Sequence, residues 1–331
     1  MAPRWRLPLL VLGFVSLAFG VAGGLARVTQ LPVSIHVLAL HGPLMVSAFF
    51  GTVISLERAA ALDRLWAYAA PLAAGAGGVL LLLGFPFEGF VAMTLAAAVL
   101  VAASMVVLTR QRSLEMATLV AGAVCWLMGN FGLLAGYPAV PWWIAFFALT
   151  IGGERLELSR YLRRGAGVRA SFMVLAAALL FAPLEPPLLG WALVLLALWL
   201  AAFDLARVTV RQAKLPRYVA VCLLAGYFWL AVGGALIALS VAYDAALHAI
   251  FVGFVFSMVF GHAPVILPAV LRVSFPYHPF LYVPLALLHA SLVVRVAVSV
   301  QIGGWGNALA IALFILTAAT LVVLIQIKPS R

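Results

Sequence analysis

The chain has 331 residues, of which 66% are hydrophobic and 9% charged, with a mean hydropathy of +1.21 and a formal net charge of +11. Soluble domains are about 45–50% apolar and about 25% charged, so this composition excludes a soluble globular protein. The basic excess does not indicate nucleic-acid binding, because Lys and Arg fall in short loops between apolar runs. Cys125 and Cys222 both lie inside apolar runs, which excludes a disulfide framework.

Apolar runs long enough to cross a hydrocarbon core of about 30 Å recur from one end of the chain to the other. They predict an all-α, polytopic membrane helix bundle of about 12 transmembrane helices, forming a single transmembrane domain over residues 1–331. Pro264 and Pro268 fall in the tenth run and predict that this helix kinks or ends early. The predicted helices cover residues 6–27, 34–56, 66–85, 89–109, 116–136, 141–159, 168–184, 187–206, 218–240, 245–271, 279–300 and 305–327.

The distribution of Lys and Arg predicts the orientation of these helices. Basic residues gather in every second connection, which the positive-inside rule assigns to the cytoplasm. The N and C termini are then cytoplasmic, and only Arg27 and Arg295 fall toward the outer face. We therefore expect a multi-pass protein of a bacterial-type inner (plasma) membrane, with the lipid bilayer and not nucleic acid as its partner.

Five of the six histidines lie on or at the edge of membrane-spanning runs. Imidazole is costly in hydrocarbon and is the commonest metal ligand, so these residues are candidate ligands. At 1.5 Å per helical residue, His41 and His248 lie about 10 Å and about 5 Å below the outer face, and His289 about 16 Å below it. His41 and His248 are therefore the favoured pair and His289 a third candidate. His36, at the outer interface, and His262, near the inner face, are weaker candidates.

Two cofactors suit these side chains. A b-type haem takes ligands from opposite faces, best supplied by two different helices, as His41 and His248 are. Haem propionates need cationic partners, and Arg27 and Arg295 are placed for that role. Copper is the alternative, because Met45 follows His41 by one turn and offers a soft ligand for Cu(I). Each histidine has a simpler interpretation, which is a hydrogen bond between neighbouring helices.

The arrangement resembles two related families of membrane proteins. The H-G-x-L-M pattern at His41, Gly42, Leu44 and Met45, with His248 on the tenth helix, resembles the haem–copper oxidase subunit I scaffold. The segments ALHAIFVGFVFSMVFGHAPVILP and LLHASLVVRVA resemble the NnrS family, haem and copper membrane proteins linked to nitric oxide stress. The resemblance implies that His41 and His248 bind haem. The predicted sixth and seventh helices contain no histidine, so a complete binuclear reductive centre is not expected.

These observations lead to one favoured function and two alternatives. We expect an integral membrane haem-binding protein, NnrS-like, that responds to nitric oxide or another diatomic gas or exchanges electrons with a redox partner. The first alternative is a copper or small-solute transporter that uses intramembrane His and Met residues. The second is a non-catalytic membrane partner subunit whose histidines only pack. The sequence assigns no catalytic residue and leaves open whether the protein is an enzyme.

Overall fold

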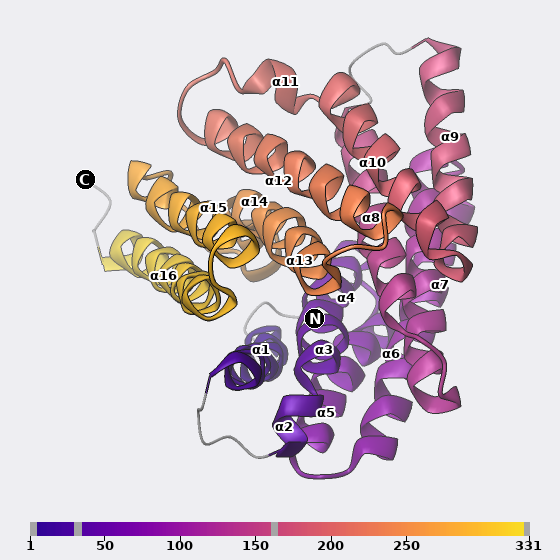
Figure 1. The fold of residues 1–331 in the computed structure, drawn as a ribbon, viewed down its shortest axis with the longest axis vertical. Coiled ribbons are helices and arrows are strands. Elements are labelled where there is room, and N and C mark those ends of the chain that lie inside the picture. Colours follow the sequence, from indigo (N-terminus) through magenta and orange to yellow (C-terminus); the bar gives the residue numbers. More distant parts are fainter. Residues whose placement is uncertain (1–4, 30–34, 160–164, 328–331) are drawn as a thin grey trace. The chain divides into compact units, whose positions relative to one another are not determined.

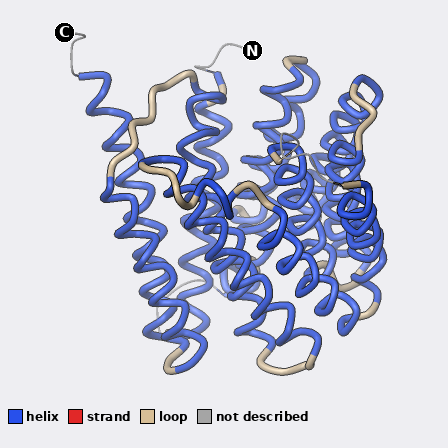
Figure 2. The backbone as a smooth tube through the Cα atoms, turned by 90° about the horizontal axis from the view of Figure 1, so that it is seen from above, coloured by secondary structure: helices blue, strands red, loops and turns tan. Residues whose placement is uncertain are grey.

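The structure is a computed structural model that describes residues 5–29, 35–159 and 165–327 (Figure 1). Over these residues the chain is helical and contains no strand, which confirms the all-helical fold class (Figure 2). The chain forms two compact units, Met1–Gly153 and Glu154–Arg331.

The first unit is built from the first five predicted spans and most of the sixth. Its second span is not one regular helix, because it changes geometry twice between Ile35 and Leu62. The elements are α1 (Leu7–Val28), α2 (Ile35–Ala39), α3 (His41–Pro43), η2 (Leu44–Phe50), α4 (Gly51–Leu62), η3 (Leu65–Tyr68), α5 (Ala69–Leu82), α6 (Pro86–Arg110), α7 (Leu114–Ala135) and α8 (Val140–Leu158), whose last five residues belong to the second unit.

The second unit contains the remaining six predicted spans. A short extra helix, α11, lies in the connection between α10 and α12. The elements are α9 (Ala166–Phe181), η4 (Ala182–Leu184), α10 (Pro186–Phe203), α11 (Ala206–Thr209), α12 (Lys214–Ala238), α13 (Tyr243–His248), η5 (Ala249–Phe256), α14 (Ser257–Leu271), η6 (Pro279–Leu281), α15 (Tyr282–Ala297) and α16 (Val300–Ile327).

Within the described residues, eleven helices are long and apolar enough to cross a membrane. The predicted sixth span, α8, is not among them, because Glu154, Arg155 and Glu157 lie in its last turns. Helix boundaries follow local chemistry: the Ser113 hydroxyl caps α7 by accepting from the N–H of Met116, at 3.2 Å. Gly136, with a φ of +78°, ends the same helix. The structure thus confirms the apolar, all-helical character that the sequence predicts.

Two of the long helices contain π-helical stretches, and both stretches follow a candidate histidine. Residues Leu44–Phe50 form η2, three positions after His41. Residues Ala249–Phe256 form η5, directly after His248. A π-helix is rare, and where it occurs it is frequently found at a functional site. No sequence pattern used above predicts these two stretches.

The helix that contains Pro264 and Pro268 does not end early. Helix α14 continues through both prolines to Leu271, and Arg272 ends it with a φ of +55°. The change in helical geometry of this span lies earlier, in η5. Proline removes one backbone donor but does not by itself stop a helix that is held by packing.

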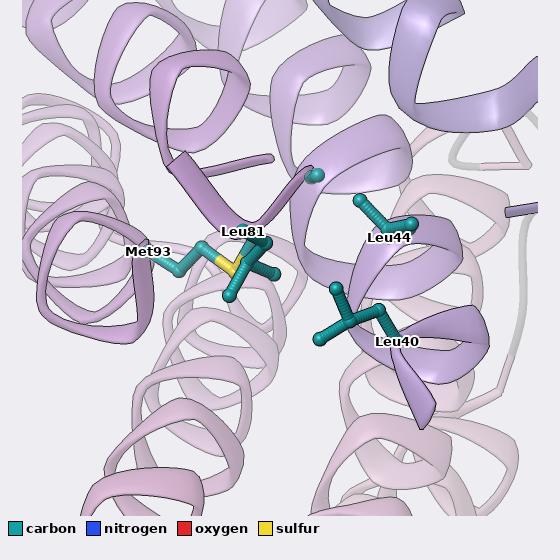
Figure 3. Close-up of a cluster of buried hydrophobic side chains, with 5 residues drawn as sticks. Leu40, Leu44, Leu81 and Met93 are labelled. Atoms are coloured by element: carbon teal, nitrogen blue, oxygen red, sulfur yellow. The ribbon is translucent and has the colours of Figure 1, made fainter. Parts of the chain in front are cut away.

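The core of the first unit packs η2 against two neighbouring helices. Leu44, which is fully buried, contacts Leu81 of α5 and Met93 of α6 in a cluster that also contains Leu40 and Ala48 (Figure 3). In the second unit, Trp229 of α12 packs against Ala249 of η5 and Leu292 of α15. In both units, therefore, buried apolar side chains hold the π-helical stretch in place.

Candidate functional site

His41 is the first residue of α3, and its imidazole packs against α1. Its Nδ1 lies 2.7 Å from the carbonyl oxygen of Gly20. Because a carbonyl oxygen only accepts, Nδ1 carries the proton, and Nε2 holds the lone pair of the neutral ring. Glycine at position 24 leaves room for the ring, since a Cβ there would lie 2.7 Å from Cε1 of His41. The glycines of α1 therefore fix both the position and the tautomer of His41.

Arg27, also on α1, binds the short helix that precedes His41. Its Nε donates to the carbonyl of Leu38 at 2.7 Å, and Nη2 donates to that of Ala39 at 3.5 Å. Pro43 has no N–H, so the Ala39 carbonyl lacks the donor that a regular helix would give it. Two donors of Arg27 thus stabilise the end of α2. The sequence predicts a haem propionate as a partner of the same residue.

A buried polar network fixes the π-helical stretch after His41. The Ser47 hydroxyl of η2 donates to Oδ1 of Asn130, and Nε1 of Trp126 donates to Ser47 at 3.2 Å. Asn130 also accepts from Nε1 of Trp143, at 3.1 Å, and donates to the carbonyl of Met93, at 2.9 Å. Each of these side chains has a partner inside the unit, and such a network specifies one conformation.

His248 ends α13 in the second unit, and Asp244 lies one turn before it. The Nδ1 of His248 donates to the main-chain carbonyl of Asp244 at 2.8 Å and lies 3.3 Å from its Oδ1. Arg295 of α15 reaches the same carboxylate, with Nη2 at 3.2 Å from Oδ1 and 2.9 Å from Oδ2. Asp244 therefore joins His248 to Arg295.

Arg295 is buried although it lies near the end of its helix. Its side chain is 7% exposed, and Nη1 donates to the carbonyl of Val300 at 3.3 Å. Its Nε is also buried but has no partner among the described residues. Close packing of α16 explains the burial, because a Cβ on Gly303 would lie 2.3 Å from the Arg295 backbone nitrogen.

Both ring nitrogens of His289 are engaged within the second unit. Nε1 of Trp229 donates to Nδ1 of His289 at 3.0 Å, so the proton of the neutral ring is on Nε2. Nε2 lies 3.3 Å from the hydroxyl of Ser257, the first residue after η5. A metal at His289 would have to replace one of these two hydrogen bonds.

The weaker candidates have separate surroundings. Nδ1 of His262 donates to the carbonyl of Met258 at 2.8 Å, and Nε2 is buried without a partner among the described residues. Met45 packs on α1, since a Cβ on Gly20 would lie 2.8 Å from its Sδ. The side chain of His36 lies outside the described residues.

A buried ion pair, which is not among the predicted site residues, lies in the second unit. Nε and Nη2 of Arg155 donate to the two carboxylate oxygens of Asp204 at 2.9 and 3.1 Å. The hydroxyl of Ser159 also donates to Asp204, at 3.4 Å. Asp204 accepts in addition from the N–H of Ala206, at 2.6 Å, and so caps α11. The ion pair thus ties the end of α8 to the start of α11.

The candidate residues form two arrangements, one in each unit. The first unit holds His41 and Met45 against α1, and the second unit brings His248 and Arg295 together through Asp244. Across the part of the chain that the structure describes, no group of three or more His, Cys, Asp or Glu side chains is arranged to hold a metal ion. Asp244 is the residue that sequence reasoning missed. The signal was its spacing of four from His248, which places both on one helix face.

Comparison with known proteins gives one match. No curated protein matches the chain, and no solved structure matches it. A family model described as "Domain of unknown function (DUF8744)" matches residues 6–323, which is nearly the full length of the chain. The chain therefore belongs to the DUF8744 family.

Proposed function

We propose that this protein is an integral membrane haem-binding protein in which His41 and His248 supply imidazole ligands to haem b. The observation that carries the proposal is a shared local construction. Each histidine lies at the start of a long apolar helix, directly before or close to a π-helical stretch, and each donates from Nδ1 to a main-chain carbonyl. This is the second-sphere bond that orients ligating histidines in metalloproteins.

The tautomer that these bonds select is the one a haem iron uses. With Nδ1 protonated, Nε2 is the basic nitrogen of both rings. Rigid elements hold each ring: α1 contacts His41, and α13 carries both His248 and its acceptor, Asp244. Ligands held in this way lose little freedom when they bind iron.

The set of donors favours haem over a metal ion bound by side chains alone. A porphyrin supplies four nitrogens to iron, so the protein needs to add only one or two ligands. A zinc or copper site usually needs three or four protein ligands. The described residues contain no group of three or more His, Cys, Asp or Glu side chains arranged for such a site.

A haem propionate has a candidate donor in the second unit. Arg295 keeps a buried Nε–H without a partner among the described residues, while Nη2 is used by Asp244. A guanidinium has five N–H donors and can serve two carboxylates at once. Arg27 is the corresponding candidate in the first unit, and its contacts with Leu38 and Ala39 keep it near the helix that leads to His41.

Iron ligation decides what the haem does. A haem with no open coordination position would exchange electrons with a redox partner, and a haem with an open position would bind nitric oxide or a similar diatomic gas. The resemblance to NnrS proteins favours the gas response. The positive-inside rule separately supports a cytoplasmic position for both termini.

Absorption spectroscopy of the purified full-length protein, expressed with haem supplied, tests the proposal. We expect a Soret band in the wild type and no band in the His41→Ala, His248→Ala double variant. His278→Ala is the matched control, because His278 is exposed and its Nδ1 only accepts from the N–H of Phe280 at the start of η6. The single variants His41→Ala and His248→Ala show which of the two residues the haem requires.

Two outcomes would contradict the proposal. One is a wild-type protein without a Soret band, and the other is a double variant with an unchanged band. A colourless protein that carries stoichiometric copper would instead favour the transporter alternative, in which Met45 joins His41 on the face toward α1.

A further inference from the structure

We infer that Asp244 is a positioning residue for His248 and makes it a stronger electron donor than His41. The inference rests on the proposed function, because it concerns a haem ligand. It goes beyond that function by assigning a role to a residue that is not among the predicted site residues.

The carboxylate of Asp244 is placed beside the imidazole by helix geometry. Residues four apart in an α-helix lie on the same face, and Asp244 and His248 are four apart in α13. The result is a separation of 3.3 Å between Oδ1 of Asp244 and Nδ1 of His248, next to the 2.8 Å bond from Nδ1 to the Asp244 carbonyl. The Nδ1–H therefore faces both a neutral and a charged oxygen of one residue.

Arg295 keeps that carboxylate in place. The side chain of Asp244 is 59% exposed and on its own would change rotamer freely, but Arg295 is 7% exposed and contacts both of its oxygens. Gly303 of α16 packs directly on the backbone of Arg295, because its lack of a Cβ allows α15 and α16 to approach closely there. A surface carboxylate thus gains a fixed position from a buried guanidinium.

The two candidate ligands differ in the charge near Nδ1. His41 donates to the neutral carbonyl of Gly20, whereas His248 has beside it the carboxylate of Asp244, whose far side is balanced by Arg295. A carboxylate at Nδ1–H raises the basicity of the ring and its donation through Nε2. Stronger donation stabilises ferric over ferrous iron, so Asp244 lowers the reduction potential of a haem held by His248.

Redox titration of the full-length haem-loaded protein tests the inference, with the midpoint potential read from the Soret band. We expect Asp244→Asn to shift the midpoint to a more positive value with the band retained. Glu185→Gln is the matched control, because Glu185 is an exposed acid in the same unit, and we expect no shift. Haem content and a Soret maximum equal to those of the wild type in Asp244→Asn show that a shift does not come from loss of packing around the haem.

A second variant keeps the test decisive if Asp244→Asn is recovered poorly. Asp244→Glu keeps a negative charge for Arg295 but moves it relative to Nδ1, and we expect a smaller shift in the same direction. Midpoints equal to wild type in both variants, with the Soret band still dependent on His248, would overturn this inference and leave the proposed function standing. A wild type without a Soret band would overturn both.

Discussion

Trp229 and His289 form a hydrogen bond between α12 and α15, with Nε1 of the indole 3.0 Å from Nδ1 of the imidazole. The other ring nitrogen of His289 meets the hydroxyl of Ser257, where η5 gives way to α14. Trp229 also packs on η5, since a Cβ on Gly253 would lie 2.4 Å from Cγ of the indole. One histidine therefore links three helices around the end of a π-helical stretch.

His289→Phe tests whether this histidine is a ligand or a link between helices. The substitution keeps a ring of similar size but removes both nitrogens, which leaves Trp229 and Ser257 without their partners. We expect the free energy of unfolding in mixed micelles to fall by about 1–3 kcal/mol and the Soret band to stay unchanged. A lost or shifted band with unchanged stability would make His289 a ligand.

Gly24→Ala tests the fit of His41 against α1. The added Cβ would lie 2.7 Å from Cε1 and 2.8 Å from Nδ1 of the ring, so the imidazole must move away from Gly20. We expect weaker haem binding, measured as a lower ratio of Soret to protein absorbance. Gly167→Ala is the control, because a Cβ there meets no atom within 4 Å. Equal haem content in the two variants would show that the contact with α1 does not position His41.

Asp204→Asn tests the buried ion pair. The charge of Arg155 would remain buried without its counter-ion, since Arg155 is 5% exposed and Asp204 is fully buried. Breaking such a pair typically costs about 3–5 kcal/mol. We expect a fall of that size in unfolding free energy, and no comparable fall for Arg112→Gln, which removes an exposed charge.

The double variant Arg155→Met, Asp204→Leu extends this test. Apolar residues that replace a buried pair together are often neutral, so most of the loss should be recovered. The cap on α11 stays broken, because Leu cannot accept from the N–H of Ala206. A double variant as unstable as Asp204→Asn would mean that charge burial is not the source of the cost.

Asn130→Asp tests the network that holds η2. The change is nearly isosteric, but it replaces the Nδ2 donor with an oxygen that faces the carbonyl of Met93. A buried, unpaired carboxylate oxygen against a carbonyl is costly, so we expect a lower melting temperature in detergent. Trp126→Phe removes the bond to Ser47 and part of the packing on Gly51 and Phe146 but buries no charge, so it should lower it less. A melting temperature for Asn130→Asp equal to wild type would contradict the network's role.

Much of the fold follows from hydrophobic runs alone. Every predicted range is helical over most of its described residues, because about 20 apolar residues between charged loops have no other stable conformation in a bilayer. Of the two outcomes expected for the tenth span, a kink or an early end, the early end does not occur, because α14 continues through Pro264 and Pro268. Loss of one backbone bond per proline is small beside the packing of a helix on its neighbours.

Side-chain partners were less predictable. The sequence indicates that Arg295 needs an anionic partner and suggests a haem propionate. In the structure Arg295 pairs with Asp244, because the end of α15 packs beside the start of α13. The partnership of Asp204 with Arg155 likewise depends on residues 49 positions apart. Apolar periodicity shows which segments are helices, but pairing between helices requires their packing, which a single sequence does not give.

The two π-helical stretches have a consequence for the length of these helices. A π-turn contains one more residue than an α-turn. Inserting one residue into an α-helix can therefore create a stretch such as η2 or η5, and deleting one residue can remove it. Deleting a residue there would restore α-geometry and turn the preceding histidine by about 100° around the helix axis. A relative that is one residue shorter in either stretch would therefore present the same histidine to a different neighbour.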